Sequence, residues 1–312
     1  MTAATAPFLL VDAFAERPFT GNSAGVVLLD RELEPRAAQA IAREVNSAET
    51  AFVRVDGLAA DPMRPIPLRW FTPSVEVDFC GHATIAAAAA IHAARVRDAE
   101  AITADAPLRF ETRSGLLEVF AMIERDATAA HPLWRLRMPE PKFEKAPLNV
   151  LELARLLGAE LDVVDPVLPL VRTRDQDVIV VVSTWQRLNE LRPNRNALRD
   201  WCQKHRLRGV VATTTHTVTK AAHVSSRFFA PAAGVDEDPV TGSMHGPLVA
   251  FLAAHGRVPV EGGVAELNCL QGIPGDRGGL VRAFLDLRET PAKVEIGGRA
   301  YVSIQGRVVL PS

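Results

Sequence analysis

The sequence predicts an α+β fold of two pseudo-symmetric halves, each a curved mixed β-sheet or barrel wrapped around a central α-helix. Three observations predict it. One phrase of the sequence occurs twice, about half a chain apart, short strand patterns are abundant, and a long uncharged run follows each copy of the phrase. Two copies are too few for a solenoid, so the repeat indicates two similar halves.

The repeated phrase consists of Arg69-Trp70-Phe71-Thr72-Pro73 and Arg227-Phe228-Phe229-Ala230-Pro231, which lie 158 positions apart. The uncharged runs that follow end at Arg95-Val96 and Arg257-Val258, which lie 162 positions apart. The second copy therefore carries four extra residues, which we place in Asp236-Glu237-Asp238-Pro239. Because the loops correspond, we expect them to face each other, with a binding site between the halves.

In the first half, short apolar runs preceded by turn residues predict strands at 8–11, 25–29, 50–53, 68–71, 116–120 and 134–138. Apolar residues at helical spacing predict a helix over 35–45. The uncharged run 79–94 has 16 residues, fewer than the roughly 20 that cross a bilayer. A helix that is apolar on all sides belongs in a core, so this run is the predicted central helix.

In the second half, the patterns predict helices over 149–157 and 196–205, with a central helix over 239–256. They predict strands at 177–182, 209–213, 224–229, 265–270, 280–287 and 301–310. Three prolines, at positions 139, 141 and 147, indicate a linker. The predicted division is 1–128 for the N-terminal half, 129–147 for the linker and 148–297 for the C-terminal half.

Composition excludes several classes of protein. The 312 residues carry a net charge of −2, from 35 basic and 37 acidic side chains, with no run of like charges. This argues against nucleic acid and against an anionic membrane surface as partners. The first residues lack the basic region and apolar core of a signal peptide, and the three cysteines lack disulfide or CxxC spacing. We therefore expect a reduced, cytoplasmic protein, and we expect a homodimer.

The two central helices begin at glycines, Gly81 and Gly242. The first turn of a helix has free N–H groups and a partial positive charge, and a glycine lets an anion approach closely. These glycines, with their neighbours Ala83 and Thr241, are candidate residues for binding a substrate carboxylate. The alternative is that both glycines only permit a tight turn from strand to helix.

Three candidate side chains accompany these helix starts. His82 could hydrogen-bond a substrate as a neutral imidazole, and we expect the helix dipole to lower its pKa. The alternative is a satisfied core histidine. Asp238 and Ser243 flank the second helix start, where Ser243 could instead serve only as an N-cap.

A fourth candidate is Glu49, which lies between a predicted helix and a predicted strand. It is the only charged residue from 45 to 53. A carboxylate in such surroundings can pass a proton in both directions, as a general acid/base must. The alternative is a solvated glutamate on the surface.

Neither a metal nor an organic cofactor is expected. Cys80, His82, Asp238 and His245 are of metal-ligand types, but no paired HxxxH or CxxC exists. We expect Cys80 and His82 to point along different faces of a turn. There is no Walker loop, no GxGxxG after a strand and no GxSxG elbow.

The motifs, in their order, resemble those of the phenazine-biosynthesis PhzF-like family, and the match runs from about residue 8 to the end. They are Asp12-Ala13-Phe14 with Pro18-Phe19-Thr20-Gly21-Asn22, Asn46-Ser47-Ala48-Glu49-Thr50-Ala51-Phe52, the first copy of the repeated phrase with Glu76, Cys80-Gly81-His82-Ala83-Thr84, Glu237-Asp238-Pro239-Val240-Thr241-Gly242-Ser243, and Gln271-Gly272. The CGHAT and EDPVTGS segments together are highly specific.

The resemblance implies a fold similar to diaminopimelate epimerase, in which the final strand, about 298–312, joins the first half. It implies a cofactor-free isomerase in which Glu49 is the general acid/base, while His82, Asp238 and Ser243 hold and polarise the substrate. The family's characterised reaction isomerises a dihydro-hydroxyanthranilate by moving a proton. The expected partner is therefore a small carboxylate-bearing substrate, similar to a cyclic amino acid.

Diaminopimelate epimerases use two cysteines, one at each helix start. Cys80 occupies the first such place, and we align it with Gly242, near which there is no cysteine. A two-thiol mechanism is thus excluded. The remaining alternative to a proton-transfer isomerase is a non-catalytic protein that binds small molecules on the same scaffold. The intact Glu49 favours the enzyme, because binding an anion does not need a carboxylate beside it.

Overall fold

One long buried helix packs against strands in each of two units of the chain. The computed structural model describes residues 4–56, 58, 61, 64–97, 107–122, 132–272 and 277–311. One unit comprises residues 1–137 with 297–312, and the other comprises residues 138–296. The predicted boundary at 128 and 129 lies outside the described residues. The α+β class with two related halves is confirmed.

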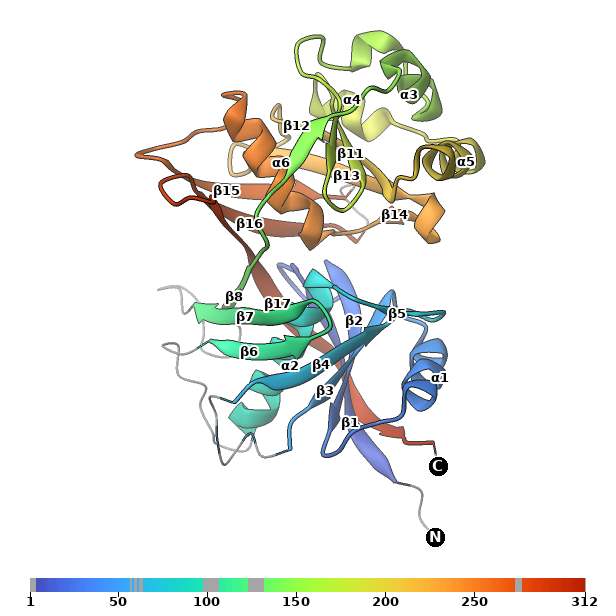
Figure 1. The fold of residues 1–312 in the computed structure, drawn as a ribbon, viewed down its shortest axis with the longest axis vertical. Coiled ribbons are helices and arrows are strands. Elements are labelled where there is room, and N and C mark those ends of the chain that lie inside the picture. The colour runs from blue at the N-terminus through green and yellow to red at the C-terminus, as the bar shows by residue number, and fades with distance from the viewer. Residues whose placement is uncertain are drawn as a thin grey trace. The chain divides into compact units, whose positions relative to one another are not determined.

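Unit 1 contains two helices and most of the N-terminal strands (Figure 1). Its elements are β1 (Thr5–Ala13), β2 (Asn22–Leu29), α1 (Pro35–Val45), β3 (Glu49–Arg54), β4 (Ile66–Phe71), β5 (Glu76–Val77), α2 (Gly81–Arg97), β6 (Leu108–Thr112), β7 (Gly115–Met122), β8 (Leu133–Arg137) and, from residue 297, β17 (Lys293–Val309).

The strands of unit 1 close into a ring. The order of neighbours is β17, β1, β2, β3, β4, β6, β7 and β8, and β8 pairs again with β17. The β2–β3 and β4–β6 pairs are parallel. Helix α2 contacts β1, β2, β3, β7 and β8, and its residues 81–92 are all buried. A helix without a polar face is thus enclosed, as its uncharged sequence predicts.

Unit 2 contains the remaining elements. They are β9 (Phe143–Lys145), α3 (Val150–Leu156), the 3₁₀ turn η1 (Leu161–Val163), β10 (Val171–Thr173), β11 (Asp177–Val181), α4 (Trp185–Glu190), α5 (Arg195–His205), β12 (Gly209–Thr214), β13 (Val224–Ala230), η2 (Pro231–Ala233), β14 (Val235–Asp238), α6 (Gly242–Ala254), β15 (Val264–Gln271), β16 (Gly279–Asp286) and the first residues of β17. The predicted linker region thus contains β8, paired within unit 1, and β9, paired with β10 in unit 2.

The pairing of strands in unit 2 repeats that of unit 1. β11–β12 is parallel as β2–β3 is, β12–β13 is antiparallel as β3–β4 is, and β13–β15 is parallel as β4–β6 is. β13 also pairs with the short β14, as β4 does with β5. Two helices complete the correspondence: α5 lies between β11 and β12 in sequence as α1 lies between β2 and β3, and α6 packs against β15 and β16.

The repeated phrase supplies the same ion pair in each unit. Arg69 on β4 donates from Nε and Nη2 to the two oxygens of Glu76, at 2.8 and 2.9 Å. Arg227 on β13 donates to Glu237 at 2.8 and 2.7 Å. Each guanidinium also lies over the phenylalanine two positions on, at 5.2 Å from the Phe71 ring and 4.8 Å from the Phe229 ring. Bidentate geometry fixes the strand that leads to each central helix.

The register corrects where we placed the insertion. Glu76 and Glu237 correspond, as do the helix starts Gly81 and Gly242, and both pairs are 161 positions apart. The second copy therefore gains three residues before Glu237. They lie in the turn that contains η2 and Gly234, whose φ is 85°. Placing the insertion in 236–239 was wrong, because this turn, rather than the acidic segment, is the longer one.

The same register shows which residue of unit 2 corresponds to Glu49. Thr50 pairs with Phe71 as Val210 pairs with Phe229, so Glu49 corresponds to Gly209. A Cβ atom at Gly209 would lie 2.5 Å from the carbonyl oxygen of Phe229 and 2.9 Å from the Phe228 ring. Unit 2 therefore has no room for a side chain at the position where unit 1 has a carboxylate.

We expect Gly209→Ala to destabilise the protein by about 1–3 kcal/mol, because the added methyl group meets backbone that cannot yield easily. The measurement is the free energy of unfolding from urea denaturation. Gly306→Ala is the matched control, since Gly306 is also a strand glycine and a Cβ there would meet nothing within 4 Å. Equal stability of the two variants would contradict the expectation.

Candidate active site

Glu49 is the first residue of β3, and the preceding turn fixes its place. Helix α1 ends at Val45, and Asn46 takes the left-handed conformation at φ 52°, with its N–H donating to the carbonyl oxygen of Ala42. Asparagine tolerates this conformation better than most residues. The chain then turns and enters β3 beside β2, where Glu49 pairs with Ala24. Its side chain is 20 % exposed.

Cys80 and His82 lie on either side of Gly81, where α2 begins. Both are buried. Thr84 donates from its hydroxyl to the carbonyl oxygen of Cys80 at 2.6 Å, which closes the first turn of the helix. In unit 2, His245 occupies the position of Thr84 and makes the same kind of bond, from Nδ1 to the carbonyl oxygen of Thr241, at 2.8 Å. Cys80 thus corresponds to Thr241 rather than to Gly242, and neither is a second cysteine.

The structure brings Glu49, Cys80 and His82 together. Nε2 of His82 lies 3.1 Å from Oε2 of Glu49, and Nδ1 of His82 lies 3.5 Å from Sγ of Cys80. The Glu49 contact has the distance of an ion pair but not the alignment of a hydrogen bond. Both nitrogens of the imidazole therefore have a defined neighbour, and the carboxylate lies beside the ring rather than in line with its N–H.

The groups around His82 shift its pKa in the direction opposite to the one expected from the sequence. Burial disfavours a charged imidazole, but Cys80 and Glu49 raise the pKa of His82 well above its ordinary value. The effects of these two neighbours outweigh that of burial, so the expected lowering of this pKa was wrong. Burial raises the pKa of the Cys80 thiol, and the charge of Glu49 raises it further.

One argument against a metal was also wrong. Cys80 and His82 do not point along different faces, since the ligand atoms of Glu49, Cys80 and His82 all lie within 4.8 Å of one another. Cys80 and Glu49, however, approach opposite nitrogens of the ring. The expected absence of a metal stays a prediction.

Asp238 lies in a separate network, in unit 2. Thr241 donates from Oγ1 to Oδ2 of Asp238. Gln271, on β15, accepts from the Thr241 N–H at 2.7 Å and donates to the carbonyl oxygen of Asp238 at 2.9 Å. These bonds fix the segment that leads into α6. They give Gln271, which the sequence showed only as part of a motif, a structural role.

Ser243 is the second residue of α6 and does not cap it. The N-cap position belongs to Thr241, so the N-cap alternative for Ser243 was wrong. Its Oγ accepts a hydrogen bond from Nη2 of Arg208 at 3.1 Å. Arg208 in turn donates from Nε and Nη2 to the fully buried carboxylate of Asp177. Burial opposes the charge of Arg208, but the bonds to Asp177 raise its pKa.

The sequence did not single out Arg208 or Asp177. They are separated by 31 positions and belong to no motif, and only the parallel pairing of β11 with β12 places Asp177 opposite Gly209. The structure thus joins Glu49 to His82 in unit 1, and Asp238 to Thr241 in unit 2. That the two sets line one cleft, with Gly81, Ala83 and Gly242, stays a prediction.

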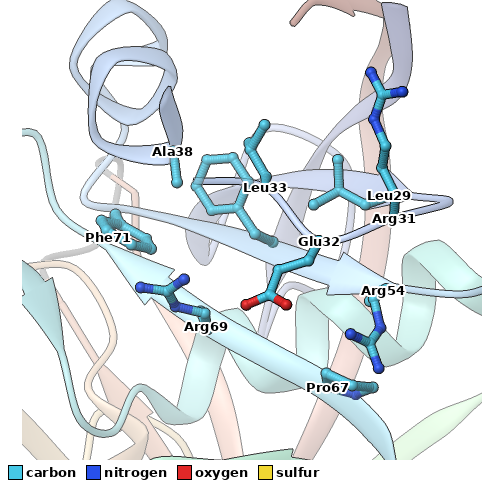
Figure 2. Close-up of a pocket in the computed structure, with 10 residues that line it drawn as sticks. Leu29, Arg31, Glu32, Leu33, Ala38, Arg54, Pro67, Arg69 and Phe71 are labelled. Atoms are coloured by element: carbon cyan, nitrogen blue, oxygen red, sulfur yellow. The ribbon is translucent and has the colours of Figure 1, made fainter. Parts of the chain in front are cut away.

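A pocket elsewhere in unit 1 is not the predicted site. It lies where α1 and residues 31–33 meet β2, β3 and β4, and Figure 2 shows the Glu32 carboxylate among its arginines. Its volume is about 70 Å³, well below the roughly 300 Å³ at which ligand pockets begin. Its arginines Arg54 and Arg69 are already paired, with Asp56 and Glu76. It contains neither Glu49 nor His82.

Comparisons with known proteins agree with the motifs. The family model described as phenazine biosynthesis-like protein, PhzC-PhzF, matches residues 11–306. An uncharacterized isomerase of Pseudomonas aeruginosa is 36% identical over 302 residues, covering 96% of this chain and 97% of its own. The crystal structure of a PhzF-family phenazine biosynthesis protein of Bacillus anthracis has a TM-score of 0.84 at 28% identity, covering 98% of this chain and all of its own.

A more distant structure is similar in fold alone. A probable proline racemase of Agrobacterium radiobacter has a TM-score of 0.64 at 13% identity, covering 98% of this chain and 94% of its own. Among the described residues, no helix has the length and apolar character that crossing a bilayer requires.

We expect the imidazole of His82 to titrate above about pH 6.5, and Glu49→Gln to move the midpoint down by removing the carboxylate. Histidine NMR signals followed against pH give this measurement. Because the folded pKa is the higher one, the stabilisation is full below the unfolded pKa and is lost as pH rises through the folded pKa. Glu49→Gln should therefore lose more stability at pH 6 than at pH 9. An unchanged midpoint would contradict the ion pair.

Proposed function

The chain belongs to the phenazine biosynthesis-like (PhzC-PhzF) family, and we propose that it is an isomerase that moves a proton on a small carboxylate-bearing substrate without a cofactor. The observation that carries the proposal is the contact between Glu49 and His82, at 3.1 Å. A general base needs a carboxylate that is held in place yet able to exchange a proton, and this one is partly buried beside a cation.

Glu49 takes a proton from a carbon next to an activating group and returns it elsewhere on the same molecule. Against the effect of burial, Cys80 and Glu49 raise the pKa of His82, which favours the charged imidazole. The charged imidazole stabilises the carboxylate before the reaction, and it can donate from Nε2, which has no hydrogen-bond acceptor among the described residues. Negative charge that develops on the substrate would attract this donor. Asp238 and Ser243 hold and polarise the substrate.

A single acid/base is supported by the comparison between units. The residue of unit 2 that corresponds to Glu49 is Gly209, where a Cβ would lie 2.5 Å from the Phe229 carbonyl oxygen. The residue that corresponds to Cys80 is Thr241. Unit 2 thus offers neither a carboxylate nor a thiol at these positions, which supports one group that moves the proton rather than two groups on opposite faces of a carbon.

We expect Glu49→Gln to lower kcat by about 10²–10⁴-fold, the usual contribution of general acid–base catalysis. The fold should be retained, because the side chains are nearly isosteric. Cys80→Ser should keep most of the activity, since no second thiol completes a pair and a hydroxyl can replace the contact with His82. The assay is incorporation of deuterium at carbon when small cyclic amino acids and related carboxylates are incubated in deuterated water.

Two outcomes would count against this proposal. Loss of activity in Cys80→Ser, with Glu49→Gln unimpaired, would assign the proton transfer to the thiol. No incorporation with any compound, despite binding of carboxylates, would favour the non-catalytic binding protein on the same scaffold.

We also expect dialysis against a strong chelator to leave the rate of deuterium incorporation unchanged, because Glu49 supplies the base and His82 the positive charge. Metal content before and after dialysis, measured by mass spectrometry, is the control. A loss of activity that zinc or another divalent ion restores would show that the ligand-type cluster of Glu49, Cys80 and His82 works with a metal.

A further inference from the structure

Arg208 is held more firmly than a surface arginine would be. It directly precedes β12, and its guanidinium donates from Nε to Oδ1 of Asp177 at 2.7 Å and from Nη2 to Oδ2. Asp177 is 0% exposed, and its own N–H donates to Oγ1 of Thr173. The guanidinium also lies over the Phe228 ring, 5.3 Å from its centroid. Two contacts thus fix the guanidinium in place, one with the Asp177 carboxylate and one with the face of the Phe228 ring.

This placement decides what the Ser243 hydroxyl can do. Nη2 of Arg208 is 3.1 Å from Oγ of Ser243, and an arginine can only donate. The serine oxygen therefore accepts this bond, and its proton is directed away from Arg208. A hydroxyl that accepts from a cation is also a stronger donor to the next group.

The contact between Arg208 and Ser243 differs from the corresponding contact in unit 1. His82 and Ser243 both follow the glycine that begins a central helix. In unit 1 the neighbour of this residue is the Glu49 carboxylate, whereas in unit 2 it is the Arg208 guanidinium. One unit therefore supplies a group that accepts a proton, and the other supplies a hydroxyl whose donor is aimed by a cation.

We propose that Arg208 is a positioning residue, clamped by Asp177, that fixes the Ser243 hydroxyl as a hydrogen-bond donor to the substrate's carboxylate. The inference rests on the proposed function, in which Ser243 holds the substrate. In this proposal Arg208 determines specificity for an anionic group over its neutral isostere. Arg208 acts through Ser243 and does not itself touch the substrate.

The test compares the affinity of the full-length protein for benzoate and for benzamide, two probes that differ in charge but hardly in shape, by isothermal titration calorimetry. Unmodified protein should prefer benzoate. Ser243→Ala should reduce this preference about tenfold or more, as expected for a hydrogen bond to a charged group. The double variant Asp177→Asn/Arg208→Gln removes both charges of the pair and should reduce the preference for benzoate by the same factor. Adding Ser243→Ala to that double variant should reduce the preference no further.

Two further variants complete the design. Arg208→Lys keeps the charge but not the fork, so it should keep part of the preference while folding normally by circular dichroism. Arg199→Gln is the matched control, because Arg199 lies on the exposed face of α5 and pairs with neighbours in its own helix. This variant should keep the full preference for benzoate. If Asp177→Asn/Arg208→Gln does not fold, Arg208→Lys decides: full retention of the preference overturns the proposal.

The remaining outcomes are distinct. Equal affinity of the unmodified protein for both probes, or additive losses for the serine and arginine changes, would also overturn the positioning role. Glu49→Gln removes a negative charge and should not lower the preference for benzoate. If Glu49→Gln retains full turnover, the proposed proton transfer fails while the role of Arg208 still stands, so the two failures can be told apart.

Discussion

The rest of the structure depends on two helices that have no polar face. A helix whose residues are apolar on every side must be covered by other elements, and in unit 1 the strands close a full ring around α2. Because the strands run around the helix, the first turn of the helix lies near an end of some of those strands. Glu49, at the start of β3, is brought to His82, in the first turn of α2, by this constraint. The candidate site is thus a consequence of burying the helix.

The same arginine–glutamate ion pair holds the strand that leads to the central helix in each unit. Arg69 with Glu76, and Arg227 with Glu237, link the last long strand before each central helix to the short strand that follows. In unit 2 the arginine is almost fully buried and also donates to the carbonyl oxygens of Leu188 and Leu191. A buried guanidinium needs this full set of partners. The residues that the repeated phrase has in common therefore link two strands in each unit and have a structural role.

The two units have diverged where chemistry would occur. Equivalent backbone positions hold Glu49 in one unit and Gly209 in the other, and equivalent helix positions hold His82 and Ser243. The tight approach of the Phe229 carbonyl oxygen at Gly209 excludes any side chain there. Unit 2 instead has Arg208, paired with the buried carboxylate of Asp177, next to Ser243 of its helix. The repeated scaffold thus places a carboxylate next to the helix start in one unit and a guanidinium next to it in the other.

The sequence alone determined the repeat, the class of fold and the two central helices, because local patterns and specific motifs carry that information. It also singled out Glu49 and His82 as candidates, and the structure brings these two residues together. The sequence misplaced the inserted residues, aligned Cys80 with Gly242 and gave the wrong direction for the pKa of His82. Each of these depends on strand register or on a distance between residues far apart in the chain. Only the tertiary structure placed Arg208 against Asp177 and Ser243, since pairing between strands, unlike periodicity along one strand, leaves no local signal in the sequence.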